Sequence, residues 1–377
     1  MKAGIVGLPN VGKSTLFNCL SNAKAQSANF PFCTIEPNIG VVNVPDPRIN
    51  KLEELVKPER VQMATVDIVD IAGLVKGASK GEGLGNQFLG NIRECNAIIH
   101  VLRCFDNDNI VHVDGSVDPI RDKETIDIEL QLKDLETVEK RLEKVKKAAK
   151  TGNKEAQVEA ALLERIREAL LQAKSARTIE PQNQDEEDLL EDFQLITAKP
   201  VLYVCNVDEN SAVNGNIYVD KVKELVKDEN AEVIILSVGA EADITELETY
   251  EERQVFLEDM GLTEPGSAVL IRAAYKLLNL QTYFTAGVKE VRAWTIIKGT
   301  KAVQLLRGIL LIVVGRFASE IIGLNTLSYL LDNVMTWGVL AIIIIFQPEL
   351  RRALEQLGRG RLFSRTNFQE ENVQEQM

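Results

Sequence analysis

A short loop bounded by two glycines lies close to the start of the chain and carries residue types that bind phosphate. Four residues separate Gly7 from Gly12, and Lys13, Ser14 and Thr15 follow directly. Glycines at this spacing let the backbone curl, so that successive N–H groups point inward at one anion. The lysine can then reach the β- and γ-phosphates, and the serine hydroxyl can ligate Mg²⁺. We therefore predict that the chain binds a nucleoside triphosphate and that Lys13 offsets phosphate charge during catalysis.

The segments around this loop predict the setting that the motif requires. Residues 3–6 are an apolar run typical of a buried strand, and residues 16–20 have the pattern of a helix. Further apolar runs at 64–69, 97–102 and 200–205 predict more strands. A glycine loop between a strand and a helix is a specific signal for phosphate binding. We expect an α/β fold of the P-loop NTPase class, with a mostly parallel sheet and flanking helices.

Asp70 and Gly73 follow the second predicted strand. In P-loop enzymes an aspartate at this place holds the metal through water, and the glycine N–H meets the γ-phosphate. The next residue is Leu74, where Ras-type enzymes have the glutamine that orients the attacking water. Leucine cannot do that, so another residue must.

Two loops are predicted to respond to the nucleotide. Residues 29–37 contain prolines and cannot form a regular helix. Within them Thr34 is the candidate for a second hydroxyl on Mg²⁺, with an ordinary solvated threonine as the alternative. The glycine-rich residues 77–85 are expected to order when nucleotide binds.

The chain contains two histidines. His100 lies within a predicted strand and is expected in the core. His112 lies in a polar loop, where we expect it to be free to swing. Since imidazole titrates near neutral pH, our hypothesis is that His112 orients the water or accepts its proton in place of Leu74. The alternative is an ordinary loop histidine.

From about residue 122 to residue 177 apolar residues recur at steps of three and four, interrupted by a polar turn at 151–153. This pattern predicts an antiparallel helical hairpin inserted in the nucleotide domain. It is either a plain structural hairpin or an arm for a partner such as the ribosome. The residues predicted to face inward are Ile128, Leu132, Leu135, Val138, Leu142 and Val145, followed by Val158, Leu162, Leu163, Ile166 and Leu170.

The base-reading site is predicted where another strand ends, at Asn206, Val207 and Glu209. Guanine-specific enzymes have the motif N-K-x-D here, and its aspartate accepts bonds from guanine. Valine replaces the lysine and the longer glutamate replaces the aspartate, so guanine preference should be weakened or lost. Ser237, after a further predicted strand, is expected to help close over the base.

Composition limits the remaining choices. The 377 residues are 45% hydrophobic, which is enough for two or three domains with a core. A net charge of -13 disfavours broad adhesion to nucleic acid, so no DNA partner is expected, although a local basic face could dock on RNA. The five cysteines are scattered and fit reduced thiols. With no signal-peptide pattern at the start, we expect a cytoplasmic protein.

Together these motifs resemble the YchF family, the Obg-like ATPases of the translation-factor class. The resemblance covers about residues 1–302. It implies hydrolysis of ATP in preference to GTP, a coiled-coil insertion, a C-terminal TGS domain and association with the ribosome, through its large subunit. The strings that carry it are GLPNVGKS at 7–14, NFPFCT at 29–34, DIAGL at 70–74, NVDE at 206–209 and YFTAG at 283–287.

The resemblance also implies roles for individual residues. Ser14 and Thr34 would ligate Mg²⁺. Asn10 is similar to the asparagine that ligates a monovalent cation in K⁺-stimulated relatives, so K⁺ is a candidate second cofactor. The residues that would bind the nucleotide are Asn10, Val11, Gly12, Lys13, Ser14 and Thr15 around the phosphates and Asn206, Val207 and Glu209 around the base.

After residue 302 the chain departs from this family. Residues 299 to about 365 resemble the membrane anchor of CdaA-type diadenylate cyclases, without that enzyme's catalytic motifs. Two apolar stretches, 309–314 and 337–346, lie in this tail, but neither reaches the roughly 18 uncharged residues of a certain membrane span. We expect membrane contact through 303–350, no cyclase activity, and a junction of two unrelated coding sequences near residue 300.

The expected organisation is a nucleotide domain at 1–121 and 196–280, the helical insertion at 122–195, a truncated TGS-like start at 281–302 and a two-helix apolar tail at 303–377. The expected function is Mg²⁺-dependent ATP hydrolysis that switches the affinity of the chain for the ribosome. The rivals are a GTPase and a non-catalytic nucleotide-binding scaffold tethered to the membrane.

Overall fold

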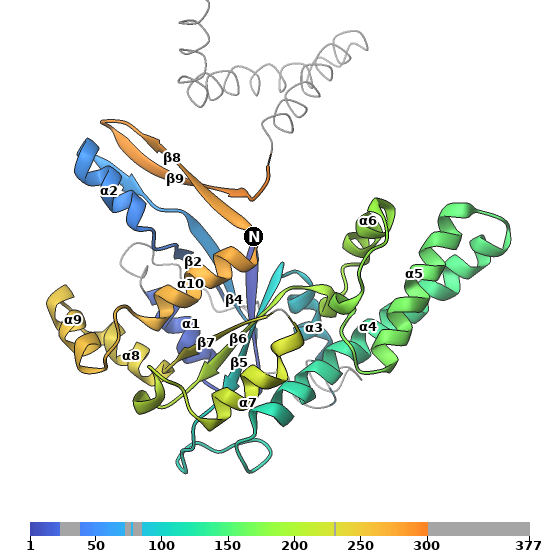
Figure 1. Ribbon diagram of the computed structural model, residues 1–377, viewed down its shortest axis with the longest axis horizontal. Coiled ribbons are helices and arrows are strands. Elements are labelled where there is room, and N and C mark those ends of the chain that lie inside the picture. Colours follow the sequence, from blue (N-terminus) through green and yellow to red (C-terminus); the bar gives the residue numbers. More distant parts are fainter. Residues whose placement is uncertain (23–37, 72–76, 78–84, 230, 301–377) are drawn as a thin grey trace, which may run out of the picture. The chain divides into compact units, whose positions relative to one another are not determined.

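A six-stranded sheet in the order β2-β4-β1-β5-β6-β7 forms the centre of the computed structural model (Figure 1). The structure describes residues 1–22, 38–71, 77, 85–229 and 231–300. Strand β2 is antiparallel to β4, and all other pairs in this sheet are parallel, which confirms the predicted mostly parallel sheet. The strands are β1 Lys2–Val6, β2 Asn38–Asn43, β4 Thr65–Asp70, β5 Ala97–Arg103, β6 Val201–Asn206 and β7 Glu232–Leu236.

Helices cover the sheet in two layers, which explains why β5 and β6 are buried at every position and are apolar apart from His100, Arg103 and Asn206. Helix α1 contacts α8 and α10 in one layer, and α4 contacts α7 in the other. The short helices of this part of the chain are α1 Lys13–Asn22, α3 Gly85–Arg93, α7 Ile217–Leu225, α8 Val238–Glu246, α9 Tyr250–Asp259 and α10 Gly266–Leu277.

The predicted helical hairpin is present and extends away from the sheet (Figure 1). Helix α4 spans Pro119–Lys150 and helix α5 spans Lys154–Leu171, with the turn where it was predicted. Helix α4 begins a few residues before the predicted start because Asp118 caps it, accepting hydrogen bonds from the first N–H groups, while a proline occupies the first turn. Helix α6, Gln184–Phe193, packs against α5 on the return.

The inward face of α4 differs from the prediction in its first half. Ile128 and Leu132 are 48% and 42% exposed, whereas Ile126 and Leu130 are buried in the core of the sheet. Further along the helix Val138, as predicted, is buried against α5. A single helix therefore serves two cores that lie on different sides of it, so one period of three and four residues cannot describe its whole length.

Asp134 fixes the base of the insertion. Its carboxylate is fully buried and accepts hydrogen bonds from the N–H groups of Ile196 (3.0 Å) and Thr197 (2.7 Å) and from the Thr197 hydroxyl (2.6 Å). Ile196 and Thr197 lie where the chain returns to the sheet, just before β6. Because an unpaired buried carboxylate would be costly, these bonds hold the hairpin to the nucleotide domain.

A second sheet has the order β3-β9-β8. Its strands are β3 Arg60–Gln62, β8 Leu280–Ala286 and β9 Glu290–Ile297, and β9 was predicted at this place. Strand β3 pairs in parallel with β9, and helix α2, Pro47–Val56, contacts both β8 and β9. The segment expected to stand as a truncated TGS-like start therefore builds its sheet with residues from the first part of the chain.

Residues 303–377, with the two predicted apolar helices, lie outside the described residues. Within the ranges given above, no helix is both long and apolar enough to cross a membrane. Membrane contact through 303–350 stays a prediction.

Candidate nucleotide-binding site

The loop between β1 and α1 has a backbone that only glycine allows at two positions. Gly7 has φ +154° and Gly12 has φ +98°. A Cβ at Gly7 would lie 2.5 Å from the carbonyl oxygen of Val101, and one at Gly12 would lie 2.7 Å from Nδ2 of Asn206. Both contacts are closer than van der Waals distance, so the loop has the close-packed form that the predicted phosphate cradle requires.

Asn206 joins this loop to the start of α8. Its Nδ2 donates to the carbonyl of Val11 (2.9 Å), and its Oδ1 accepts from the N–H of Val238 (3.0 Å). The side chain is buried, and both ends of its carboxamide are therefore engaged. Asn206 was predicted beside the base, and the structure shows a positioning residue that sets the phosphate loop against the predicted base pocket.

Lys13 is buried at the first position of α1, and its Nζ donates to the carbonyl of Leu8 within the loop (2.6 Å). Burial lowers the pKa of Lys13 to about 8, and the charge of Asp70 acts in the opposite direction. Because few neighbouring negative charges balance the buried ammonium of Lys13, this site favours an anionic ligand such as a triphosphate.

Asp70 ends β4 as predicted, and its Oδ1 is buried without a hydrogen-bond partner among the described residues. An unsatisfied carboxylate oxygen beside a phosphate loop fits a Mg²⁺ ion or the water around it. Ser14 and Thr15 follow Lys13 and are exposed. Their hydroxyls are hard oxygen donors that suit the same ion. Thr34 and Gly73, the other predicted contacts of this group, lie outside the described residues.

Asn10 has a left-handed backbone, with φ 63°, and its side-chain Nδ2 donates to the carbonyl of Val111 (3.1 Å). The phosphate loop is thus bonded to the loop that carries His112. This contact is between segments about a hundred residues apart, and no pattern in the sequence indicated it. Ligation of K⁺ by Asn10 stays a prediction.

The expectation that His112 swings freely is wrong. The side chain is buried, its Nε2 lies 2.9 Å from Oδ2 of Asp122, and its Nδ1 accepts from the N–H of Asp114 (3.1 Å). These bonds make Nε2 the donor to Asp122. In this arrangement His112 anchors its loop to the first turn of α4. Its predicted role in orienting water stays a prediction and requires that the Asp122 bond open. His100 is buried in β5, as predicted.

The predicted base pocket divides into buried and exposed residues. Val207 is buried, and its N–H donates to the carbonyl of Leu236 (3.0 Å). Ser237 is also buried and caps α8 by accepting from the N–H of Ala240 (3.4 Å). Glu209 is exposed at the start of a short 3₁₀ helix. Of the predicted base-contacting side chains, Glu209 is the one that is open to a ligand.

A central parallel strand, a glycine loop with a buried lysine, an unsatisfied aspartate at the next strand end and an asparagine that ties the loop down define a P-loop NTPase. The solved structure titled "Structure of the Schizosaccharomyces pombe YchF GTPase" superposes with a TM-score of 0.70 at 40% identity, covering 81% of this chain and 82% of that one.

Two curated relatives, both named ribosome-binding ATPase YchF, extend the comparison. The protein of Escherichia coli O157:H7 is 55% identical over 303 residues, covering 80% of this chain and 83% of its own length. The protein of Bacillus subtilis is 54% identical over 304 residues, covering 80% and 82%. The chain belongs to the YchF family.

Two family models match different parts of the chain. The model described as a 50S ribosome-binding GTPase matches residues 2–149, and the model described as the CdaA N-terminal transmembrane domain matches residues 289–350. The second match begins one residue before β9, so it overlaps the end of the YchF match rather than following it. Both resemblances noted from the sequence are confirmed.

The pKa of Lys13 gives a testable consequence. At pH 8 about half of the Lys13 side chains are neutral, and an anionic triphosphate favours the charged form, so binding should take up about half a proton at pH 8 and less at pH 7. For the same reason ATP affinity should fall as the pH rises above 8. Calorimetry in buffers of different ionisation enthalpy measures this uptake.

Lys276→Met serves as a control. It removes a lysine whose side chain is 80% exposed, and it should leave the proton uptake on ATP binding unchanged. Binding heats at pH 8 that do not depend on the buffer would contradict the assignment.

Proposed function

We propose that this chain hydrolyses ATP with Mg²⁺ and uses the nucleotide state to control its association with the ribosome. The observation that supports this most is the pairing of a buried, poorly compensated Lys13 with the unsatisfied carboxylate of Asp70 at the glycine loop. The family supports it too, because the E. coli O157:H7 and B. subtilis relatives bear the name ribosome-binding ATPase.

In the proposed reaction the loop amides and Lys13 bind the β- and γ-phosphates and stabilise the charge that builds up on them. Ser14, Thr34 and, through water, Asp70 would hold Mg²⁺, which would supply further charge neutralisation. The Gly73 N–H is assigned to the γ-phosphate. His112, once released from Asp122, would orient the attacking water. In this reaction the protein positions the phosphates and the water and forms no covalent bond to them.

Preference for adenine is proposed from Val207 and Glu209. The short aspartate of guanine-specific sites accepts two donors from the base, and adenine has neither of them. The exposed Glu209 is one methylene longer, and the buried Val207 has no ammonium group to pack along the base. The description GTPase, given to the S. pombe relative and to the matching family model, makes GTP the second candidate.

A contact between the segment expected to respond to the nucleotide and the hairpin supports the proposed switch. The N–H of Gly77, within the predicted second switch segment, donates to Oε1 of Glu129 on α4 (2.7 Å). Glu129 is buried, so movement of Gly77 would act on α4 directly.

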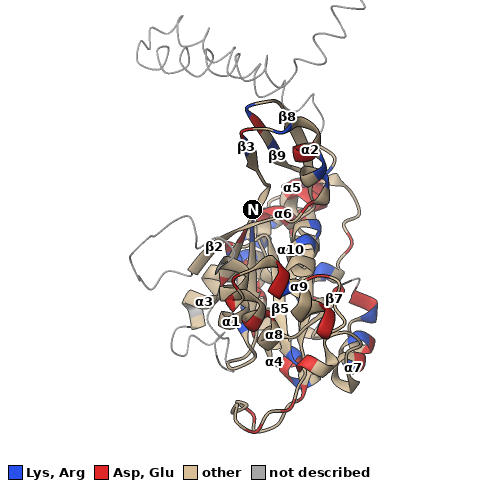
Figure 2. Cartoon of the chain, turned by 90° about the vertical axis from the view of Figure 1, so that its left-hand side faces the viewer, with Lys and Arg blue, Asp and Glu red and all other residues tan. Residues whose placement is uncertain are grey.

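Figure 2 shows acidic and basic residues interspersed over the described elements, so RNA contact would depend on a local basic group. One groove on α3 and α4 is lined by Arg93, Lys133, Lys140, Arg141 and Lys144, among others.

The proposed site of action is the cytoplasm, and the proposed membrane contact is the tail. K⁺ is proposed as a second cofactor through Asn10. A non-catalytic scaffold remains the rival from another class, and tight ATP binding without turnover would favour it.

The nucleotide preference is tested by calorimetry of the full chain with MgATP and MgGTP. We expect ATP to bind more tightly, by about tenfold or more. Glu209→Asp restores the shorter acid and should narrow the difference, whereas Glu224→Asp, on an exposed residue of α7, should not. Tighter binding of GTP by the unaltered chain would refute the proposal.

The role of His112 is tested by single-turnover hydrolysis at saturating ATP. If His112 orients water, His112→Ala slows hydrolysis by about a hundredfold, whereas Asp122→Asn, which weakens the anchor but keeps the imidazole, slows it much less. If His112 is an anchor alone, both variants lower the unfolding temperature and neither changes the rate more than the other. The second result would remove His112 from the mechanism.

Coupling to the ribosome is tested with Glu129→Ala. The full chain should sediment with ribosomes to different extents with ATP and without nucleotide. We expect the variant to bind ATP within about threefold of the unaltered chain, because Glu129 lies outside the P-loop, but to lose this difference. The control is Glu143→Ala, an exposed residue on the same helix. A variant that still responds to ATP would show that the Gly77 bond does not carry the signal.

A further inference from the structure

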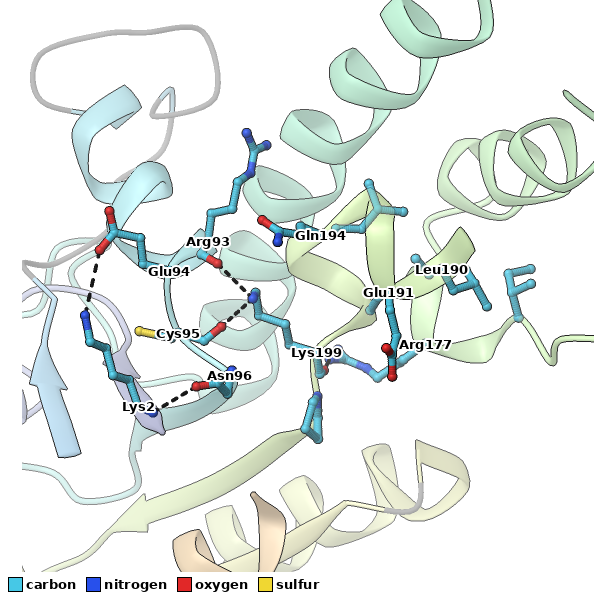
Figure 3. A pocket seen from close by; sticks show the side chains of 15 residues that line it. Lys2, Arg93, Glu94, Cys95, Asn96, Arg177, Leu190, Glu191, Gln194 and Lys199 are labelled. Atoms are coloured by element: carbon cyan, nitrogen blue, oxygen red, sulfur yellow. Dashed lines mark hydrogen bonds and ion pairs between the residues drawn. The ribbon is translucent and has the colours of Figure 1, made fainter. Parts of the chain in front are cut away.

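Figure 3 shows a pocket of about 820 Å³. It lies at the opposite end of the sheet from the phosphate loop. The phosphate loop follows the carboxyl end of β1, whereas this pocket is lined by Lys2 at the start of β1, by Asn96 just before β5 and by Pro200 just before β6. Its other wall comes from the insertion. The pocket is therefore separate from the nucleotide site.

Three of the four cations that line the pocket, Arg93, Arg177 and Lys199, are held by neutral oxygens. The ammonium of Lys199 donates to the carbonyls of Arg93 (2.9 Å) and Cys95, as Figure 3 shows. Arg177 donates to the carbonyl of Lys199 (3.1 Å) and to the hydroxyl of Ser175 (3.1 Å). These bonds fix the side chains in place without an ion pair, although the buried carboxylate of Asp134 lies close enough to oppose the lowering of the Lys199 pKa by burial.

Arg93 completes the group. It donates to the hydroxyl of Thr137 (3.1 Å), and its Nε is buried without a hydrogen-bond partner in the described part of the chain. None of Arg93, Arg177 and Lys199 forms an ion pair with a described residue, although most basic residues of the hairpin do. In a chain of net charge -13 such a group stands out.

The acids in the pocket wall do not supply the missing charge. Four basic and two acidic residues line it. Of the acids, Glu94 lies 4.0 Å from the ammonium of Lys2, and Glu191 is exposed. Burial also lowers the pKa of Lys199, which an anion in the pocket would oppose. The pocket thus carries a surplus of fixed positive charge.

The remaining wall is mostly apolar and includes Ile179, Leu190 and Leu195, with the amides of Asn96 and Gln194 beside them. Guanidinium and ammonium groups together suit a phosphate dianion, and an apolar wall suits an organic group attached to it. We propose that the pocket between Arg93, Arg177 and Lys199 binds a small organic phosphate ester, independently of the nucleotide at the phosphate loop.

The test uses pyridoxal 5′-phosphate on the full chain, followed by borohydride reduction and peptide mapping. The aldehyde condenses with a lysine amine and releases water, and borohydride reduces the imine to a stable amine. We expect labelling of Lys199 to exceed that of the exposed Lys276 and to exceed labelling by pyridoxal, which lacks the phosphate, by about tenfold. Equal labelling by the two aldehydes at Lys199 would overturn the proposal.

Arg177→Gln serves as the test variant and Arg167→Gln, on an exposed ion pair of α5, as its control. Arg177→Gln should lower labelling of Lys199 by pyridoxal 5′-phosphate while leaving labelling by pyridoxal unchanged. A fall in both would indicate that Lys199 has merely moved, and no fall in either would show that Arg177 does not hold the phosphate. Both results count against the proposal.

The same peptide map distinguishes this pocket from the nucleotide site. Competing phosphate compounds then show which kind of phosphate the pocket binds. ATP at a concentration just sufficient to fill the phosphate loop should protect Lys13 and leave Lys199 reactive, so failure of the proposed function and failure of this inference show at different peptides. AMP or inorganic phosphate should protect Lys199. Protection by a short single-stranded RNA at a lower phosphate concentration than AMP would assign the pocket to RNA and overturn the small-molecule proposal.

Discussion

The nucleotide site depends on the two hydrogen bonds of the Asn206 carboxamide. One end holds the carbonyl of Val11 in the phosphate loop, and the other holds the N–H of Val238 at the start of α8. Both partners are buried main-chain groups, and a buried group that loses its partner costs about 1–3 kcal/mol. Because one rigid side chain makes both bonds, the place where phosphates would bind and the place where a base would bind are set in a single geometry.

Close to Asn206, a lysine and an aspartate lack the charged partners that a bound nucleotide and its metal ion would supply. Lys13 is bonded to a carbonyl rather than to a carboxylate, and Asp70 has an oxygen with no partner among the described residues. Fixed groups of this kind need little reorganisation when an anion and a metal ion arrive. The pocket around Lys199 follows the same rule at the far end of the sheet, with its cations held by carbonyl and hydroxyl oxygens.

Structure that depends on local sequence patterns was predicted well, whereas contacts between distant segments were not predicted. The glycine loop, the strand before Asp70 and the hairpin turn were all predictable, because spacing and apolar period depend on near neighbours. The exposed side of α4 at Ile128 was not, since the helix packs on the sheet first and on α5 later. Likewise, nothing near His112 in the sequence indicated that Asp122 and the N–H of Asp114 would hold its ring.

The parallel pairing of β3 with β9 has a consequence for how the chain folds during synthesis. Residues 60–62 leave the translating ribosome early, yet their partners at 290–292 are added more than two hundred residues later. Until then the short strand has an open edge, and helix α2 lacks the surface that it covers. Such long-range closure slows folding and leaves apolar surface available to chaperones. The second sheet is therefore the last part of the described structure that can form during synthesis.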